Sequence, residues 1–169
     1  MLLNAFPVKS ISNDHFHSNT FSGSDEVDYL RSVNLFKNKS WIEVNFDYLY
    51  TEYVQFLMLN EEGKIYYLPA FLNNFFDLRF TNLEFFTYFL SDLEFGLFVP
   101  VSDQLQSKSR DSSYQIPHDY SHFEKVNPIQ SKLVAMFLVN VANLLSGESY
   151  EAQQAQRALT NYWGNFLLF

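Results

Sequence analysis

A chain of 169 residues with 47% hydrophobic and 19% aromatic residues has enough apolar side chains for one folded domain and too many for a disordered chain. The absence of cysteine excludes disulfides, thiolate metal sites and thiol nucleophiles. The formal net charge is −8, and the acidic excess lies in residues 43–103, where ten acidic residues accompany only Lys64 and Arg79. This distribution lacks the basic surface that nucleic acids require and suits a basic protein partner.

The beginning of the chain has no regular pattern. Residues 1–23 contain neither the basic region nor the long apolar run of a signal peptide, and no later run approaches the roughly 18 apolar residues that span a bilayer. We therefore expect an irregular lead-in and a cytoplasmic protein without a membrane segment. Ser24 then precedes an acidic first turn, which predicts a helix over about 25–37. Its apolar face is marked by Val27, Leu30, Val33 or Asn34, and Leu35.

The next segment has two interpretations. Apolar residues recur at helical spacing over 46–57, after the capping-box spacing Ser40-x-x-Glu43. The alternative is a small β-hairpin near 54–68, since residues 65–68 favour a strand. Pro69 suits the first position of a helix and forces the residue before it into an extended conformation, so either interpretation predicts a helix that begins at Pro69.

The middle of the chain alternates between order and a long loop. A second capping-box spacing, Thr81-x-x-Glu84, predicts a helix that follows it and is antiparallel to the helix from Pro69. Residues 96–101 fit a short strand. Residues 102–126 are rich in Ser, Gln and Lys and predict a long surface loop.

The last third predicts two helices. Asn127, Pro128 and Gln130 form a strong start signal, and Gly147 is expected to end this helix as its C′ residue. Residues 149–166 keep helical spacing and contain small side chains that allow a close approach to the preceding helix.

Together these elements predict a mainly α fold. We expect one domain over residues 1–169, built as a bundle of about five to six helices, with the small β-hairpin near 54–68 as the alternative for that segment. The aromatic run Tyr66–Phe76 is expected to be its central packing element, because each buried aromatic side chain removes roughly 150–250 Å² from water.

Catalytic and metal-binding patterns are weak. The pair His118 and His122 has a spacing that can hold a metal, but it lies in the predicted loop, and Asp119 is badly placed to act as a catalytic acid between them. The five glycines are isolated, so no phosphate-binding loop is predicted, and no nucleophile elbow is present. We therefore predict no catalytic residue, no metal and no cofactor.

Two motifs give the chain a distinctive order. Tyr66-Tyr67-Leu68-Pro69-Ala70-Phe71-Leu72 is followed late in the chain by Ala155-x-x-Ala158-Leu159-x-x-Tyr162-Trp163. In this order, and over about residues 40–165, the chain resembles an uncharacterised bacterial family of small cytoplasmic proteins, a domain of unknown function. The resemblance implies packing motifs and supplies no catalytic residue.

The sequence thus favours a non-enzymatic, protein-binding function. Small, acidic, cysteine-free bacterial proteins without catalytic motifs are similar in kind to immunity proteins that neutralise toxins. We expect an acidic surface to bind a basic toxin or effector. Its candidate residues are Glu43, Asp47, Glu52, Glu61, Glu62, Asp92, Glu94 and Asp103. The alternatives are a small metal-assisted hydrolase that uses His118 and His122, and a homodimeric helical adaptor.

Overall fold

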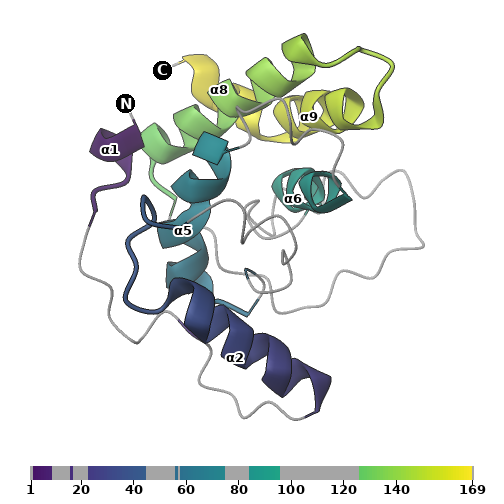
Figure 1. Ribbon diagram of the computed structural model, residues 1–169. Coiled ribbons are helices and arrows are strands. Elements are labelled where there is room, and N and C mark those ends of the chain that lie inside the picture. The colour runs from purple at the N-terminus through teal and green to yellow at the C-terminus, as the bar shows by residue number, and fades with distance from the viewer. Residues whose placement is uncertain are drawn as a thin grey trace. The chain divides into compact units, whose positions relative to one another are not determined.

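The computed structural model describes residues 2–8, 16, 23–44, 56, 58–74, 84–95 and 126–168. The chain divides into two compact units, residues 1–85 and 86–169. The regular structure of the described residues is helical (Figure 1), apart from one isolated antiparallel bridge between Phe16 and Leu59. The prediction of a mainly α fold is therefore confirmed. The predicted strand at 96–101, the loop at 102–126 and nearly all of the helix at 46–57 lie outside the described residues.

The first unit begins with two helices. A short helix, α1 (Leu2–Ala5), lies in the segment that was expected to be irregular. Helix α2 (Ser24–Phe36) matches the helix predicted over 25–37. Of its predicted apolar face, Leu35 is buried at 6% exposure, whereas Val27 and Leu30 are 49% and 53% exposed. Among the side chains of α2 that the structure describes, Ser32, Leu35 and Phe36 are buried, so the buried part of the helix lies near its C-terminal end.

Helix α5 (Glu61–Asn74) is the central element of the first unit (Figure 1). It overturns the β-hairpin near 54–68 and also the expected helix start at Pro69, which lies inside the helix. Two contacts of Asn60 explain the earlier start. Its side-chain oxygen accepts from the Gly63 N–H at 2.9 Å, and its carbonyl accepts from the Lys64 N–H at 2.9 Å. An Asn that caps a helix in this way outweighs the strand preference of residues 65–68.

Burial along α5 explains why the helix tolerates a proline. Residues 67–72 are almost completely inaccessible to solvent. Two ring pairs join the helix to its surroundings, Phe36–Tyr67 with centroids 4.6 Å apart and Phe56–Phe71 at 4.4 Å. Packing on this scale offsets the hydrogen bond that a proline inside a helix cannot donate. The expectation that this aromatic run forms a packing centre is confirmed for Tyr67 and Phe71.

The second unit contains α6 (Glu84–Phe95, all but its first two residues), α8 (Pro128–Leu144), α9 (Tyr150–Asn161) and the 3₁₀ helix η5 (Trp163–Leu168). The capping box at Asn127 is present: its side chain accepts from the Gln130 N–H, and the Gln130 side chain accepts from the Asn127 N–H, each at 3.0 Å. The helix ends before its predicted closing residue, with Leu145 as the C-cap and Gly147 in the following turn.

Small residues and one glycine shape the end of the chain. Ala152, Ala155 and Ala158 are buried on α9, which packs against α8 (Figure 1). The last helix is shorter than the predicted 149–166, because the backbone leaves the helical conformation at Tyr162. Where η5 follows, a Cβ at Gly164 would lie 2.6 Å from the main-chain oxygen of Leu159, so only glycine fits this close approach.

Candidate functional site

A tight segment directly after α2, residues 37–44, lies at the surface of the described part of the first unit. We call it the 37–44 turn. Asn38 has a positive φ of 61°, a conformation that asparagine adopts more readily than most residues, and this reverses the chain directly after the helix. Trp41 and Val44 are buried, whereas the intervening Ile42 is 57% exposed and Glu43 is also exposed. The turn therefore presents an apolar side chain next to a carboxylate.

Buried hydrogen bonds hold the 37–44 turn in place. The Tyr67 hydroxyl from α5 lies 2.7 Å from the carbonyl oxygen of Phe36 and 2.9 Å from that of Lys39. The Trp41 indole N–H donates to the carbonyl oxygen of Phe6 at 3.1 Å. Since these contacts join the turn to α5 and to the residue after α1, the positions of its exposed side chains are set by the core.

The Glu43 carboxylate is oriented from within the turn. Its Oε2 accepts from the Ser40 hydroxyl at 2.5 Å and from the Ser40 N–H at 2.7 Å. The hydrogen bond from the hydroxyl and then that from the N–H lower the pKa of Glu43, with a smaller contribution from the charge of Lys39. Glu43 is thus a charged group of defined orientation on the surface. The Ser40-x-x-Glu43 spacing was the sequence signal for this contact, whereas no pattern singled out Ile42.

The other predicted acidic residues do not form one described surface. Glu62 is exposed on α5, but Glu94 is 2% exposed, so its assignment to a binding surface is corrected. Asp92 is half-buried, and burial raises the pKa of its carboxyl group to about 7. Of the remaining predicted residues, Asp47, Glu52 and Asp103 lie outside the described residues, and Glu61 is described only in its backbone, as the first residue of α5.

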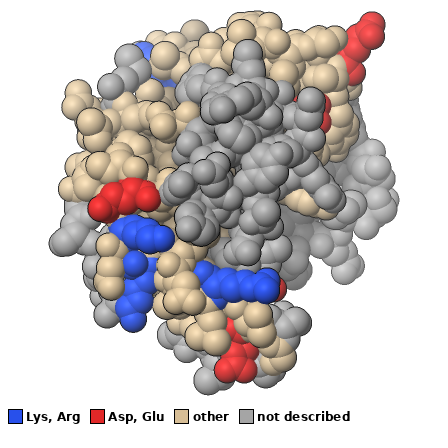
Figure 2. All heavy atoms as spheres, viewed as in Figure 1, with Lys and Arg blue, Asp and Glu red and all other residues tan. Residues whose placement is uncertain are grey.

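The described surface around α2 carries both signs of charge. Figure 2 shows blue and red side chains together in the lower part of the view, where Figure 1 places this helix. Arg31 and Lys37 are exposed there, and Arg31 lies 3.7 Å from the carboxylate of Asp28. A partner of this region would therefore meet individual carboxylates such as Glu43 rather than a continuous acidic field.

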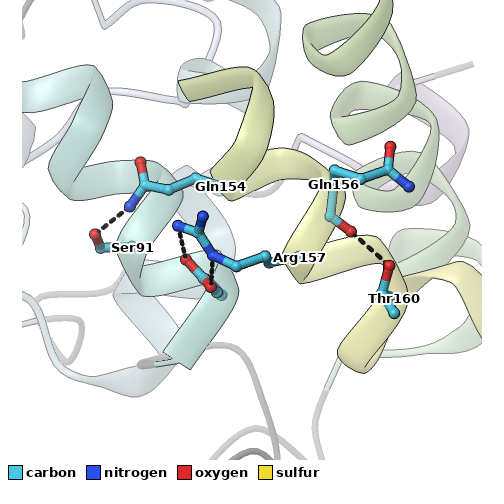
Figure 3. Close-up of polar contacts among 6 residues, drawn as sticks. Ser91, Gln154, Gln156, Arg157 and Thr160 are labelled. Atoms are coloured by element: carbon cyan, nitrogen blue, oxygen red, sulfur yellow. Dashed lines mark hydrogen bonds and ion pairs between the residues drawn. The ribbon is translucent and has the colours of Figure 1, made fainter. Parts of the chain in front are cut away.

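Glu94 instead belongs to a row of polar contacts between α6 and α9. Its two carboxylate oxygens accept from Arg157 Nε at 2.5 Å and from Nη2 at 3.2 Å. One turn earlier, Gln154 Nε2 donates to the Ser91 hydroxyl at 2.6 Å (Figure 3). The Gln154 Oε1 atom is buried and has no hydrogen-bond partner. Burial raises the pKa of Glu94, and the hydrogen bond and charge of Arg157 offset part of that shift.

An open groove lies between α8, α9 and η5. It has a volume of about 310 Å³ and is lined mainly by uncharged side chains that include Val139, Leu159 and Leu167. Thr160 and Gln156 also line the groove. The Thr160 hydroxyl donates a hydrogen bond of 2.8 Å to the main-chain carbonyl oxygen of Gln156 (Figure 3). None of the described residues that line the groove has a titratable side chain.

Comparison of the chain with protein-family models, with curated proteins and with solved structures gives no match. The resemblance to an uncharacterised bacterial family therefore stays a prediction. Within the part of the chain that the structure describes, no group of three His, Asp or Glu side chains could hold a metal ion, and no helix is long and apolar enough to cross a bilayer. His118, Asp119 and His122 lie outside the described residues.

Proposed function

We propose that this protein binds another protein and blocks it, in the manner of an immunity protein that neutralises a toxin. The observation that carries the proposal is the pair of exposed side chains on the 37–44 turn, Ile42 and Glu43. Most of the binding energy at a protein interface comes from a few side chains that lose their contact with water in the complex. The charged Glu43 suits a basic partner, and complementary charge accelerates capture.

The rigidity of the turn supports the same proposal. Binding is weakened when side chains or loops must be ordered at the interface, at a cost of roughly 0.5–1.5 kcal/mol for each flexible side chain. In the 37–44 turn, the contacts of Tyr67, Trp41 and Ser40 order the backbone and Glu43 before a partner arrives. The surface is therefore organised for recognition, and the function is proposed to be non-enzymatic.

Site-specific photo-crosslinking in the native host tests this function. A photoreactive amino acid at position 42 should capture one cognate protein, whereas the same amino acid at Leu168, which is 88% exposed on the second unit, should not. With that protein purified, Ile42→Ala should weaken binding about tenfold or more, and Glu43→Gln should mainly slow association. The cognate protein should lose its own activity when the wild-type chain is added. Equal capture from both positions, or unchanged binding by both variants, would contradict the proposal.

One observation favours the homodimeric adaptor as a second function. Ile129, Met136 and Leu144 on α8 are 63%, 36% and 59% exposed, and their spacings of seven and eight residues place them on one face of the helix. Sedimentation at two concentrations distinguishes the two functions, since an adaptor that closes this face against a second copy would sediment faster at the higher concentration. The variant Met136→Glu should then restore the monomer.

A further inference from the structure

One of the two carboxylate oxygens of Glu43 is already occupied within the 37–44 turn. Its Oε2 accepts two hydrogen bonds, from the Ser40 hydroxyl at 2.5 Å and from the Ser40 N–H at 2.7 Å. A carboxylate oxygen has two lone pairs, so these two donors use the acceptor capacity of Oε2. Since Glu43 is exposed, Oε1 is the oxygen that a group from outside the protein can approach.

This occupancy distinguishes between the two basic side chains that a partner can offer. A guanidinium group binds a carboxylate best as a fork, in which two parallel N–H groups donate to the two oxygens. Glu43 cannot accept such a fork while both lone pairs of Oε2 are used. A lysine ammonium group is a compact point charge that needs only one oxygen, so the occupied Oε2 does not weaken its contact.

The residue beside Glu43 fits the rest of a lysine side chain. Ile42 is 57% exposed and directly precedes Glu43 in the 37–44 turn. The apolar stem of a lysine covers apolar surface while its ammonium group stays in contact with water or with a charge. Ile42 therefore offers a contact for the stem, and Glu43 offers an oxygen for the ammonium group.

We propose that Ile42 and Glu43 form a subsite for one lysine side chain of the partner, with the stem against Ile42 and the ammonium group on Oε1 of Glu43. The inference rests on the proposed function and deepens it, because it names the chemical group that the 37–44 turn recognises. Lys39 is a nearby cation that would repel this lysine. Its charge contributes least to the lowered pKa of Glu43, so the hydrogen bonds from Ser40 are the larger influence on the carboxylate.

A displayed peptide library tests the inference without the native partner. The probe is a library of disulfide-cyclised peptides in which each basic position encodes lysine or arginine with equal frequency. The library is selected on the folded, full-length protein, and the binders that are lost on Glu43→Gln are sequenced. Among them, lysine should exceed arginine by about threefold or more, and Ile42→Ser should weaken the same peptides by a similar factor.

Two comparisons separate this preference from a general attraction to carboxylates. Ser40→Ala frees one lone pair of Oε2, so arginine should become at least as frequent as lysine among the Glu43-dependent binders. Glu26 on α2 is the matched control, because it is exposed beside the 49% exposed Val27, and the residue three positions earlier, Gly23, has no hydroxyl. Binders that are lost on Glu26→Gln should show no excess of lysine.

Three results would overturn the proposal. They are arginine as frequent as lysine among the Glu43-dependent binders, an excess of lysine that is unchanged on Ser40→Ala, and a selection in which no peptide depends on Glu43. None of them affects the capture of a native protein at position 42, so the blocking function would still stand. If the lysine preference were present but no native protein were captured, the blocking function alone would be contradicted.

Discussion

Replacement of Arg157 by methionine should be strongly destabilising, because the arginine neutralises a buried carboxylate. The Glu94 side chain has no exposed surface, and both of its oxygens accept hydrogen bonds from Arg157. Removal of one partner from a buried ion pair typically costs about 3–5 kcal/mol. Because the Arg157 side chain is 41% exposed, water can approach the vacated position, and we expect the lower value of about 2–3 kcal/mol.

The pH dependence identifies the cause of this loss. Without Arg157, the pKa of Glu94 rises further above its value in the unfolded chain, so the folded state is penalised most where the carboxyl group should be ionised. As the pH falls, Glu94 takes up a proton in the folded state and the penalty decreases. The stability difference between Arg157→Met and the wild type should therefore be smaller near pH 5 than near pH 7.

Urea unfolding followed by far-ultraviolet circular dichroism measures both effects. The double variant Glu94→Leu/Arg157→Met is the matched control and should be within about 1 kcal/mol of the wild type, since a well-packed apolar pair replaces the charges. If Arg157→Met lost less than about 0.5 kcal/mol near pH 7, or lost the same amount near pH 5, the carboxylate would not be the cause of the instability.

Three further predictions concern single side chains. Tyr67→Phe should lower the free energy of unfolding by about 1–2 kcal/mol and accelerate amide exchange in the 37–44 turn, because the carbonyl groups of Phe36 and Lys39 lose the hydroxyl that they share as a donor. Unchanged amide exchange would mean that packing alone holds the turn. Gly164→Ala should lower the free energy of unfolding in urea by about 1–3 kcal/mol, because the added Cβ would clash with the main-chain oxygen of Leu159. The control is Gly147→Ala, which should be nearly neutral because no atom lies within 4 Å of its added Cβ. The free energy of unfolding of the wild type should rise by up to about 3 kcal/mol between about pH 8 and pH 10, because Lys64 loses its proton in this range only in the folded state. If the variant Lys64→Met showed the same rise in urea unfolding, Lys64 would not be its cause.

The helices could be predicted where local signals and burial agree. The Asn127 capping box is an interaction within a few residues, so its pattern is visible in the sequence. The same logic failed at Pro69, because a locally favoured helix start was overridden by the cap at Asn60 and by the burial of residues 67–72 in the middle of α5. That decision depends on side chains far away in the sequence.

The candidate site was only partly predictable for the same reason. The sequence singled out Glu43 through its charge and its spacing from Ser40, and the structure shows it exposed on the 37–44 turn. It could not separate Glu43 from Glu94, since both are acidic residues in an acidic region. The difference lies in Arg157, which is 63 residues from Glu94 along the chain. Whether Ile42 is buried or exposed likewise depends on the hydrogen bond from the neighbouring Trp41 indole to the carbonyl oxygen of Phe6, which is 35 residues away along the chain.

The two tryptophans of the chain are distributed so that each unit contains one. Trp41 donates to the carbonyl of Phe6 in the first unit, and Trp163 donates to the carbonyl of Leu93 in the second at 2.7 Å. Both indoles are buried, so the fluorescence of each should shift to longer wavelength only when its own unit unfolds. Trp41→Phe and Trp163→Phe would therefore turn the protein into a pair of single-site optical reporters, one for each unit.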